Sequence, residues 1–248
     1  MSPDIPEPGY YGKLPTYGDF IQKRLPRDFV QPWDDWLQTG IAAAKERLPQ
    51  EWLTHYLNCP AWKFVLAGGV CGSQACAGVT IPSVDRVGRY FNFTLATMLP
   101  TYTAPTGFLI NQFDWLQQME DLAIGVLEDE LDQDGLEDGL AQFDMLPVEI
   151  ERERPVFHSG DGFMRLLFRE PTEAPDQVQA LLHELVQDNR DEGYGIWMQR
   201  GSHQVHPQIL VCRGMPSTEQ FLDLMMNEDA EDPEEDAGDD LIDQFLSS

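Results

Sequence analysis

WKFVLAGGVC (residues 62–71) and ACAGVTI (residues 75–81) decide the fold class, because two apolar runs are separated by only three residues, Gly-Ser-Gln. Strand-like runs joined by a short segment that contains glycine are typical of a β-hairpin. A third run, RYFNFTLATML (residues 89–99), shows the alternation of another strand. Neighbouring strands linked by hairpins predict antiparallel pairing and disfavour a purely parallel, doubly wound sheet.

The third run also predicts how its side chains are divided between the two faces of the sheet. Because successive strand residues point to opposite faces, we expect Phe91, Phe93 and Leu95 to share one face. The intervening polar positions belong to the other face.

Helical patterns lie on both sides of these strands. Apolar spacing predicts helices over residues 32–48, 50–58, 112–131, 175–187 and 217–226, and further strands over 163–169, 193–199 and 207–212. Residues 132–147 read as a loop with a broken helix, and Ser217 with Gln220 predicts a capping box. The chain is therefore predicted to form one α/β domain over residues 1–226, a mostly antiparallel or mixed sheet with helices packed on both faces.

Charge is distributed unevenly along the 248 residues. The formal net charge is −27, yet residues 1–100 carry nine acids and nine bases, whereas residues 101–248 carry 34 acids and seven bases. This field repels nucleic acids and anionic membranes, so it favours a basic protein partner or simple solubility. With neither a signal peptide nor an uninterrupted apolar run of roughly 18 residues, the sequence predicts a cytoplasmic protein that is not embedded in a membrane.

Residues 227–248 differ in composition from everything before them. NEDAEDPEEDAGDD has no base and no large apolar residue, which predicts a flexible, self-repelling acidic tail. The tail ends in LIDQFLSS, where four residues would share a helical face: Leu241, Ile242, Phe245 and Leu246. It could dock, steered by charge and anchored by these four, or it could be a disordered, solubilising end. The composition favours the second hypothesis.

GKLPTYGDFI (residues 12–21) contains a glycine-lysine step that invites a phosphate-binding interpretation. The phosphate-binding loop needs G-x-x-x-x-G-K-[ST], but here the upstream glycine is Gly9 and no hydroxyl follows Lys13. Pro15 also removes a backbone donor that such a loop would use. The spacing disfavours nucleotide binding.

PSVDRVGRYF (residues 82–91) brings Asp85 close to Arg86 and Arg89 in a loop between two strands. Such a group could form an anion site or an acid–base pair, but a clasp that ties loops together is the favoured hypothesis. Its expected partners are Lys13 and Asp19. Gly12 and Gly18 are predicted to permit tight turns there, and the result would be a rigid surface for another polypeptide.

No complete metal or catalytic motif is present. His203-x-x-His206 with Cys212 lacks the remaining zinc ligands, and the serines lie outside a G-x-S-x-G elbow. The four cysteines at irregular spacing do not suggest a disulfide framework. Neither a metal nor a cofactor is predicted. Tryptophans 33, 36, 52 and 62 are predicted to be mainly core residues.

Three stretches together carry a family resemblance. GYYGKLPTYGDFIQKRLPRDFVQPWDDWL (residues 9–37), CPAWKF (59–64) and GVTIPSVDRVGRYFNFTL (78–95) resemble the TagF family, also called ImpM, of bacterial type VI secretion. PQILVCRGMPSTEQFLDLM (207–225) is similar to the family's last strand and helix. The positions that match its motifs are Gly12, Lys13, Pro15, Gly18, Asp19, Phe20, Trp33, Trp36, Pro60, Trp62, Pro82, Ser83, Asp85, Gly88, Arg89 and Phe91.

The resemblance implies a three-layer α/β sandwich and a regulator instead of an enzyme. It implies a cytoplasmic, post-translational repressor that binds and sequesters the forkhead-associated scaffold protein of the secretion system. It assigns no catalytic role to any motif position. The alternative that the residues leave open is an enzyme or small-anion-binding protein that uses Lys13, Asp19, Asp85 and Arg89.

Overall fold

The structure is a computed structural model that describes residues 6–100, 105–128, 132–143, 163–167, 193–201 and 205–226. Its sheet has eight strands in the order β2-β1-β5-β4-β3-β7-β8-β6. Every pairing between neighbouring strands is antiparallel. The predicted helix over residues 175–187 and the acidic tail over 227–248 lie outside the described residues.

The strands are β1 (Gly9–Gly12), β2 (Ile21–Lys23), β3 (Trp62–Leu66), β4 (Ala75–Ile81), β5 (Phe93–Leu99), β6 (Phe163–Leu167), β7 (Tyr194–Gln199) and β8 (Gln208–Arg213). The helices are α1 (Arg27–Arg47), α2 (Trp52–Asn58), α3 (Pro105–Asn111), α4 (Phe113–Leu127), α5 (Gln133–Leu140) and α7 (Thr218–Met225).

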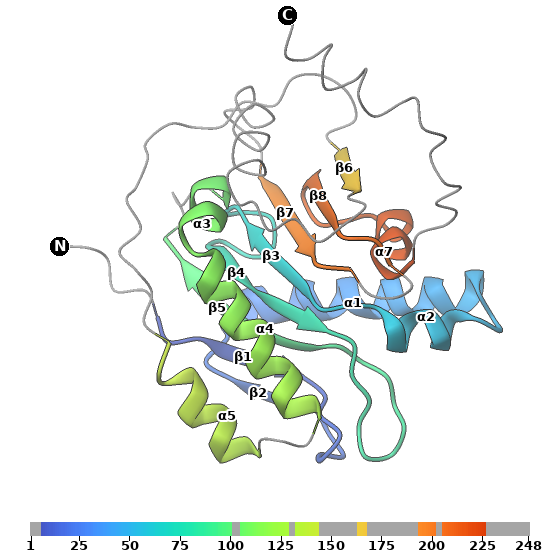
Figure 1. Cartoon of the computed structure of the whole chain (residues 1–248), viewed down its shortest axis with the longest axis horizontal. Coiled ribbons are helices and arrows are strands. Elements are labelled where there is room, and N and C mark those ends of the chain that lie inside the picture. The colour runs from blue at the N-terminus through green and yellow to red at the C-terminus, as the bar shows by residue number, and fades with distance from the viewer. Residues whose placement is uncertain are drawn as a thin grey trace, which may run out of the picture.

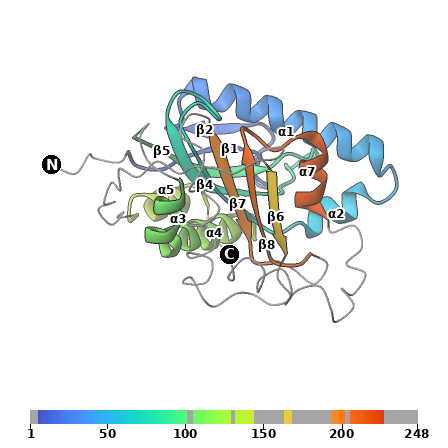
Figure 2. The ribbon, with the colours of Figure 1, turned by 90° about the horizontal axis from the view of Figure 1, so that it is seen from above.

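Helices cover both faces of the sheet, so the molecule is a three-layer α/β sandwich and the predicted fold class is confirmed (Figures 1 and 2). Helices α1, α2 and α7 lie on one face, and α3, α4 and α5 lie on the other. Strand β3 contributes side chains to the cores on both faces of the sheet. Its residues Trp62, Phe64 and Leu66 enter the core against α1, and Val65 enters the core against α4.

The hairpin that decides the fold is present, with a longer turn than predicted. β3 ends at Leu66 and β4 starts at Ala75, so residues 67–74 connect them. Two glycines in that connection, Gly69 and Gly72, have φ angles of 92° and 94°, a region that favours glycine. The capping box of α7 is also confirmed, because Ser217 and Gln220 cap each other's backbone N–H groups.

Helix α1 begins five residues before its predicted start, at Arg27. The predicted start at residue 32 was wrong because a proline usually lies in the first turn of a helix, whereas Pro32 lies inside α1. A proline there loses one helical hydrogen bond. Burial of Phe29 and Val30 against the sheet extends the apolar stripe backward and offsets that loss.

The opening stretch forms two strands that the sequence did not predict. β1 pairs with both β2 and β5, which brings Tyr10 and Tyr11 into the two opposite cores. The glycines at both ends of β1 make this strand difficult to predict from the sequence, because glycine is depleted in strands. Both glycines are needed because neighbouring backbone approaches them closely. A Cβ on Gly9 would lie 2.3 Å from the Lys23 carbonyl oxygen, and a Cβ on Gly12 would lie 2.1 Å from the Asn92 carbonyl oxygen.

The prediction for Phe91 was wrong. Phe93 and Leu95 join the core against α4, but Phe91 joins the core against α1. The regular alternation starts only at Phe93, where β5 begins. Phe91 still belongs to the preceding loop, and its backbone N–H donates to the Ser83 carbonyl at 3.1 Å.

Helix α1 packs so closely on α7 that we expect Gly40→Ala to destabilise the fold. A Cβ at Gly40 would lie 2.5 Å from the ring of Phe221, which Trp36 contacts edge-on. Overpacking costs about 1–3 kcal/mol, which exceeds the gain of about 0.5–1 kcal/mol in helix propensity. Urea unfolding should show a net loss of about 1 kcal/mol in the free energy of unfolding.

Gly107→Ala in α3 is the matched control, because a Cβ there meets nothing within 4 Å. It should gain up to about 1 kcal/mol. Equal stabilisation of both variants would show that α1 and α7 separate without cost.

Candidate functional site: a clasp between two loops

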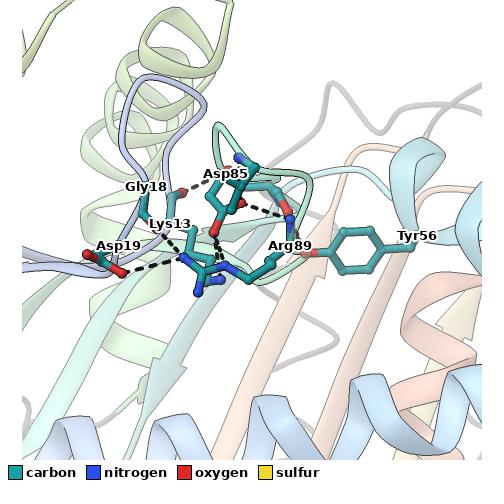
Figure 3. A network of polar contacts seen from close by, with 8 residues as sticks. Lys13, Gly18, Asp19, Tyr56, Asp85 and Arg89 are labelled. Atoms are coloured by element: carbon teal, nitrogen blue, oxygen red, sulfur yellow. Dashed lines mark hydrogen bonds and ion pairs between the residues drawn. The ribbon is translucent and has the colours of Figure 1, made fainter.

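Two loops meet at one end of the sheet and are joined by charged side chains (Figure 3). Residues 13–20 connect β1 to β2, and residues 82–92 connect β4 to β5. We call the contacts among Lys13, Gly18, Asp19, Asp85 and Arg89 the clasp. The tie that the sequence predicts between these loops is present.

Asp85 is the centre of the clasp. Its Oδ2 accepts from Lys13 Nζ at 2.8 Å and from Arg89 Nε at 2.7 Å. Its Oδ1 accepts from the backbone N–H groups of Val87 at 3.0 Å and Arg89 at 2.8 Å. A carboxylate offers about four lone-pair positions, so this one is fully used.

The Lys13–Asp85 pair in the clasp is charged although it is shielded from water. The side chain of Asp85 is 0% exposed and that of Lys13 is 6% exposed. Burial alone would raise the pKa of Asp85, but hydrogen bonds from Lys13, Arg89 and Val87 outweigh it and hold this pKa well below its usual range. Asp85 therefore stays ionised at neutral pH.

Backbone contacts add to the charged ones. The guanidinium of Arg89 donates to the Gly18 carbonyl. The Arg86 N–H donates to the Tyr17 carbonyl at 3.0 Å, and the Ser83 hydroxyl donates to the Lys13 carbonyl at 2.8 Å. These bonds fix the 13–20 loop onto the 82–92 loop along its whole length.

The predicted contact of Asp19 is present but weak, and the predicted role of Gly18 is wrong. Asp19 lies 3.5 Å from Arg89 with its side chain 99% exposed, and such solvated pairs stabilise little. Gly18 is not required for a turn: it has no positive φ, and a Cβ there would meet only Arg86 at 3.7 Å. Gly12 and Gly88 do need glycine, with φ angles of 137° and 84°.

Helix α2 supports the clasp through Tyr56, which the sequence did not single out. Its hydroxyl lies 3.1 Å from the Ser83 carbonyl and 3.1 Å from Asn92 Oδ1, and it accepts from the Ser83 N–H at 3.1 Å. Burial raises the pKa of Tyr56, so the phenol stays neutral and available as a donor. Nothing in the local sequence marks this tyrosine, because its partners are 27 and 36 positions away.

Aromatic rings form the floor and part of the surface of the clasp. Phe20 is 45% exposed. It stacks on Tyr11 at 5.5 Å and meets Phe91 edge-on at 4.8 Å. Lys13 Nζ lies 5.0 Å from the centre of the Phe20 ring, so a single ammonium contacts both the carboxylate and the aromatic surface.

The comparisons with known proteins identify the family. The model of the TagF N-terminal domain, described as type VI secretion system-associated, matches residues 9–143, a stretch that includes both clasped loops. The chain belongs to the TagF family. The resemblance that the sequence motifs carry is thereby confirmed. A comparison with curated proteins gave no match.

A solved structure extends the similarity beyond the family model. The crystal structure of PA0076 from Pseudomonas aeruginosa PAO1 has 34% sequence identity and a TM-score of 0.71 with this TagF-family chain. The similarity covers 90% of this chain and 95% of PA0076. It therefore extends well beyond residues 9–143.

The tryptophan motif positions of this TagF-family chain are structural. Trp33 is buried, stacks on Trp197 at 5.8 Å and donates to Thr94. Trp62 is buried and donates to the Leu224 carbonyl, whereas Trp36 is partly buried and donates to that of Pro216. The predicted core role is confirmed for these three, and Trp52 packs partly buried at the same core.

A small cavity lies beside the clasp. It measures about 20 Å³, enough for one water molecule, and Tyr56, Pro82, Asn92 and Leu224 are among its lining residues. The alternative hypothesis of an enzyme or anion-binding protein needs a pocket lined by Lys13, Asp19, Asp85 and Arg89. None of these four lines this cavity, and they contact one another instead.

Other chemistry-bearing residues are buried or outside the described ranges. All four cysteines are free and buried, and burial raises the pKa of Cys59, Cys71 and Cys212 to about 12. Within the described residues, no group of three or more potential ligands could hold a metal ion. His203 lies outside them. The described helices include none that is long and apolar enough to cross a bilayer.

Three ion pairs outside the clasp were not predicted from the sequence. The dense run of acids over residues 128–138 is typical of a solvated face. In the structure, however, Glu137 pairs with Lys23 at 2.8 Å and with Arg24 at 2.7 Å. Burial alone would raise the pKa of Glu137, but hydrogen bonds from Lys23 and Arg24 outweigh that effect and lower the pKa to about 2. Lys63 on β3 pairs with Glu120 on α4 inside the core.

We expect Asp85→Asn to lower the free energy of unfolding at pH 7, because it leaves the buried Lys13 ammonium without a counter-charge. The folded pKa of Asp85 is depressed, so its ionic contribution is present above the unfolded value of about 3.9 and is lost as pH falls from there. The stability difference between wild type and variant should therefore shrink below about pH 4. Urea unfolding between pH 3 and 7 measures it.

Asp19→Asn is the control, since it removes the same charge from an exposed position on the same loops. It should leave stability nearly unchanged. Equal effects of Asp19→Asn and Asp85→Asn at pH 7 would contradict the assigned role of the buried carboxylate.

Proposed function

We propose that this chain is a cytoplasmic accessory protein of type VI secretion that represses the system after translation. It does so by binding and sequestering the forkhead-associated scaffold protein. The observation that carries the proposal is the family match over residues 9–143, which spans the clasp and both of its loops. Repression by sequestration requires tight binding and sufficient concentration, and it requires no catalytic step.

The clasp supports a binding function because its charged groups are occupied with one another. Asp85 has four hydrogen bonds within the protein, so it has no free position for a proton or substrate. The outer side of the same loops, in contrast, exposes groups that suit a protein interface. We call Phe20, Arg86, Val87 and Arg89 the platform.

The platform combines rigidity with exposed contact groups. The side chain of Val87 is 65% exposed and that of Arg89 is 54% exposed. Arginine and aromatic residues are enriched among the residues that contribute most to protein interfaces. Because the clasp already orders these loops, binding would cost less conformational entropy than binding by a mobile loop.

Purification of the tagged chain from its own cells should recover the forkhead-associated scaffold protein. Two purified proteins should also form a complex by biolayer interferometry. Overproduction of the chain should lower effector release without lowering the amount of scaffold protein. Failure to recover this scaffold, together with no measurable affinity between the purified proteins, would refute the proposal.

We further expect Val87→Asp to weaken scaffold binding at least about tenfold, since it replaces the most exposed apolar side chain of the platform with a charge. Val87 contributes to the clasp through its backbone N–H, which donates to Asp85, so the clasp should survive the change. Ala42→Asp, at an exposed position of α1, is the matched control and should bind as wild type. Equal affinity of both variants would place the scaffold on another surface.

A further inference from the structure

Three large apolar side chains are conspicuously exposed in the described part of the chain, and all belong to segments at one end of the sheet. They are Phe20, Leu57 and Val87, at 45%, 53% and 65% exposure. Phe20 and Val87 belong to the platform. Leu57 follows Tyr56, whose hydroxyl contacts Ser83 in the 82–92 loop.

The same end of the sheet is locally basic in a very acidic chain. The loops 13–20 and 82–92 carry Lys13, Arg86 and Arg89 against two carboxylates, whereas the whole chain has a net charge of −27. Lys13 and Asp85 neutralise each other inside the clasp, whereas Arg86, Arg89 and Asp19 are exposed, so the exposed side chains of these loops carry one net positive charge. The platform therefore presents cationic and apolar groups together.

The last described residues of the chain lie near the start of the 82–92 loop. The Leu224 carbonyl near the end of α7 accepts from Trp62, and Trp62 pairs with Thr80 at the end of β4 where the 82–92 loop starts. Met225 and Pro82 also line the same small cavity. Residues 227–248 follow directly, and 22 extended residues can span roughly 70 Å. The tail can therefore reach every part of the platform.

We propose that residues 227–248 dock intramolecularly on the platform. The tail has ten acids and no base, and it ends with Leu241, Ile242, Phe245 and Leu246. Its acids match Arg86 and Arg89, and its apolar end matches Phe20 and Val87. Tethering gives the tail a millimolar effective concentration at a surface this near, so weak contacts suffice to keep it bound.

Docking would make the tail a competitor for any partner that uses the platform. This regulatory consequence rests on the proposed function, but the docking itself does not. The test therefore uses the full chain alone, and a negative result would leave scaffold binding untouched.

A nitroxide spin label at Ser248→Cys reports where the tail lies. Selective labelling is feasible because the four native cysteines are buried. At low salt, the amide resonances of residues 16–20 and 86–89 should broaden selectively. The broadening should be lost in 1 M salt, where the Debye length falls to about 3 Å. Broadening that is absent, or spread evenly over the surface, would overturn the proposal.

Arg86→Glu in the labelled chain should abolish the selective broadening. Arg27→Glu is the matched control, because Arg27 begins α1 next to Asp28, which binds Ser73 at the opposite end of β4. It makes the same charge reversal and should leave the broadening intact. Identical spectra for Arg86→Glu and wild type would contradict docking at the platform.

A mixture of isotope-labelled chain without nitroxide and spin-labelled chain without isotope tests whether the contact lies within one molecule. Intramolecular docking predicts no broadening in the mixture. Broadening there would instead assign the platform to the tail of a second copy and would overturn the proposal.

Discussion

One buried carboxylate organises the functional end of this molecule. Asp85 accepts from an ammonium on one loop and from a guanidinium and two backbone amides on its own loop. Burying a charge is costly unless it is paired and hydrogen-bonded, and here both conditions are met. The 13–20 loop supplies the Lys13 ammonium that balances this carboxylate, and the 82–92 loop supplies the Arg89 guanidinium that donates to the Gly18 carbonyl.

Such a pair is costly to break, because removing one partner leaves the other charge buried and unpaired. A well-packed apolar replacement is often as stable as a buried ion pair, but it does not fix direction in the same way. In the clasp, the planar Arg89 side chain reaches both Asp85 and the Gly18 carbonyl. The positions of Phe20 and Val87 at the surface are consequences of that geometry.

The clasp could be predicted because its charges are complementary. The residues that support it could not, because they are distant in the sequence. Lys13, Asp85 and Arg89 stood out because glycine-rich loops with complementary charges tend to dock. Tyr56 did not, since its contribution appears only when α2 packs beside the 82–92 loop. Strand β1 was hidden by glycines that backbone crowding requires, and the pairing of Glu137 was hidden within a dense run of acids.

The fold class was easier to predict than the division of side chains between its faces. Hairpin connections and interleaved helices specify an antiparallel sheet with two helical layers whatever the details of each loop. Phe91 shows the limit of such predictions. The side of the sheet on which it packs depends on where pairing with β1 begins, which is at Phe93. A sequence pattern shows that side chains alternate between the two faces of a strand. Which residue starts this alternation is set by the hydrogen bonds of the loop that precedes the strand.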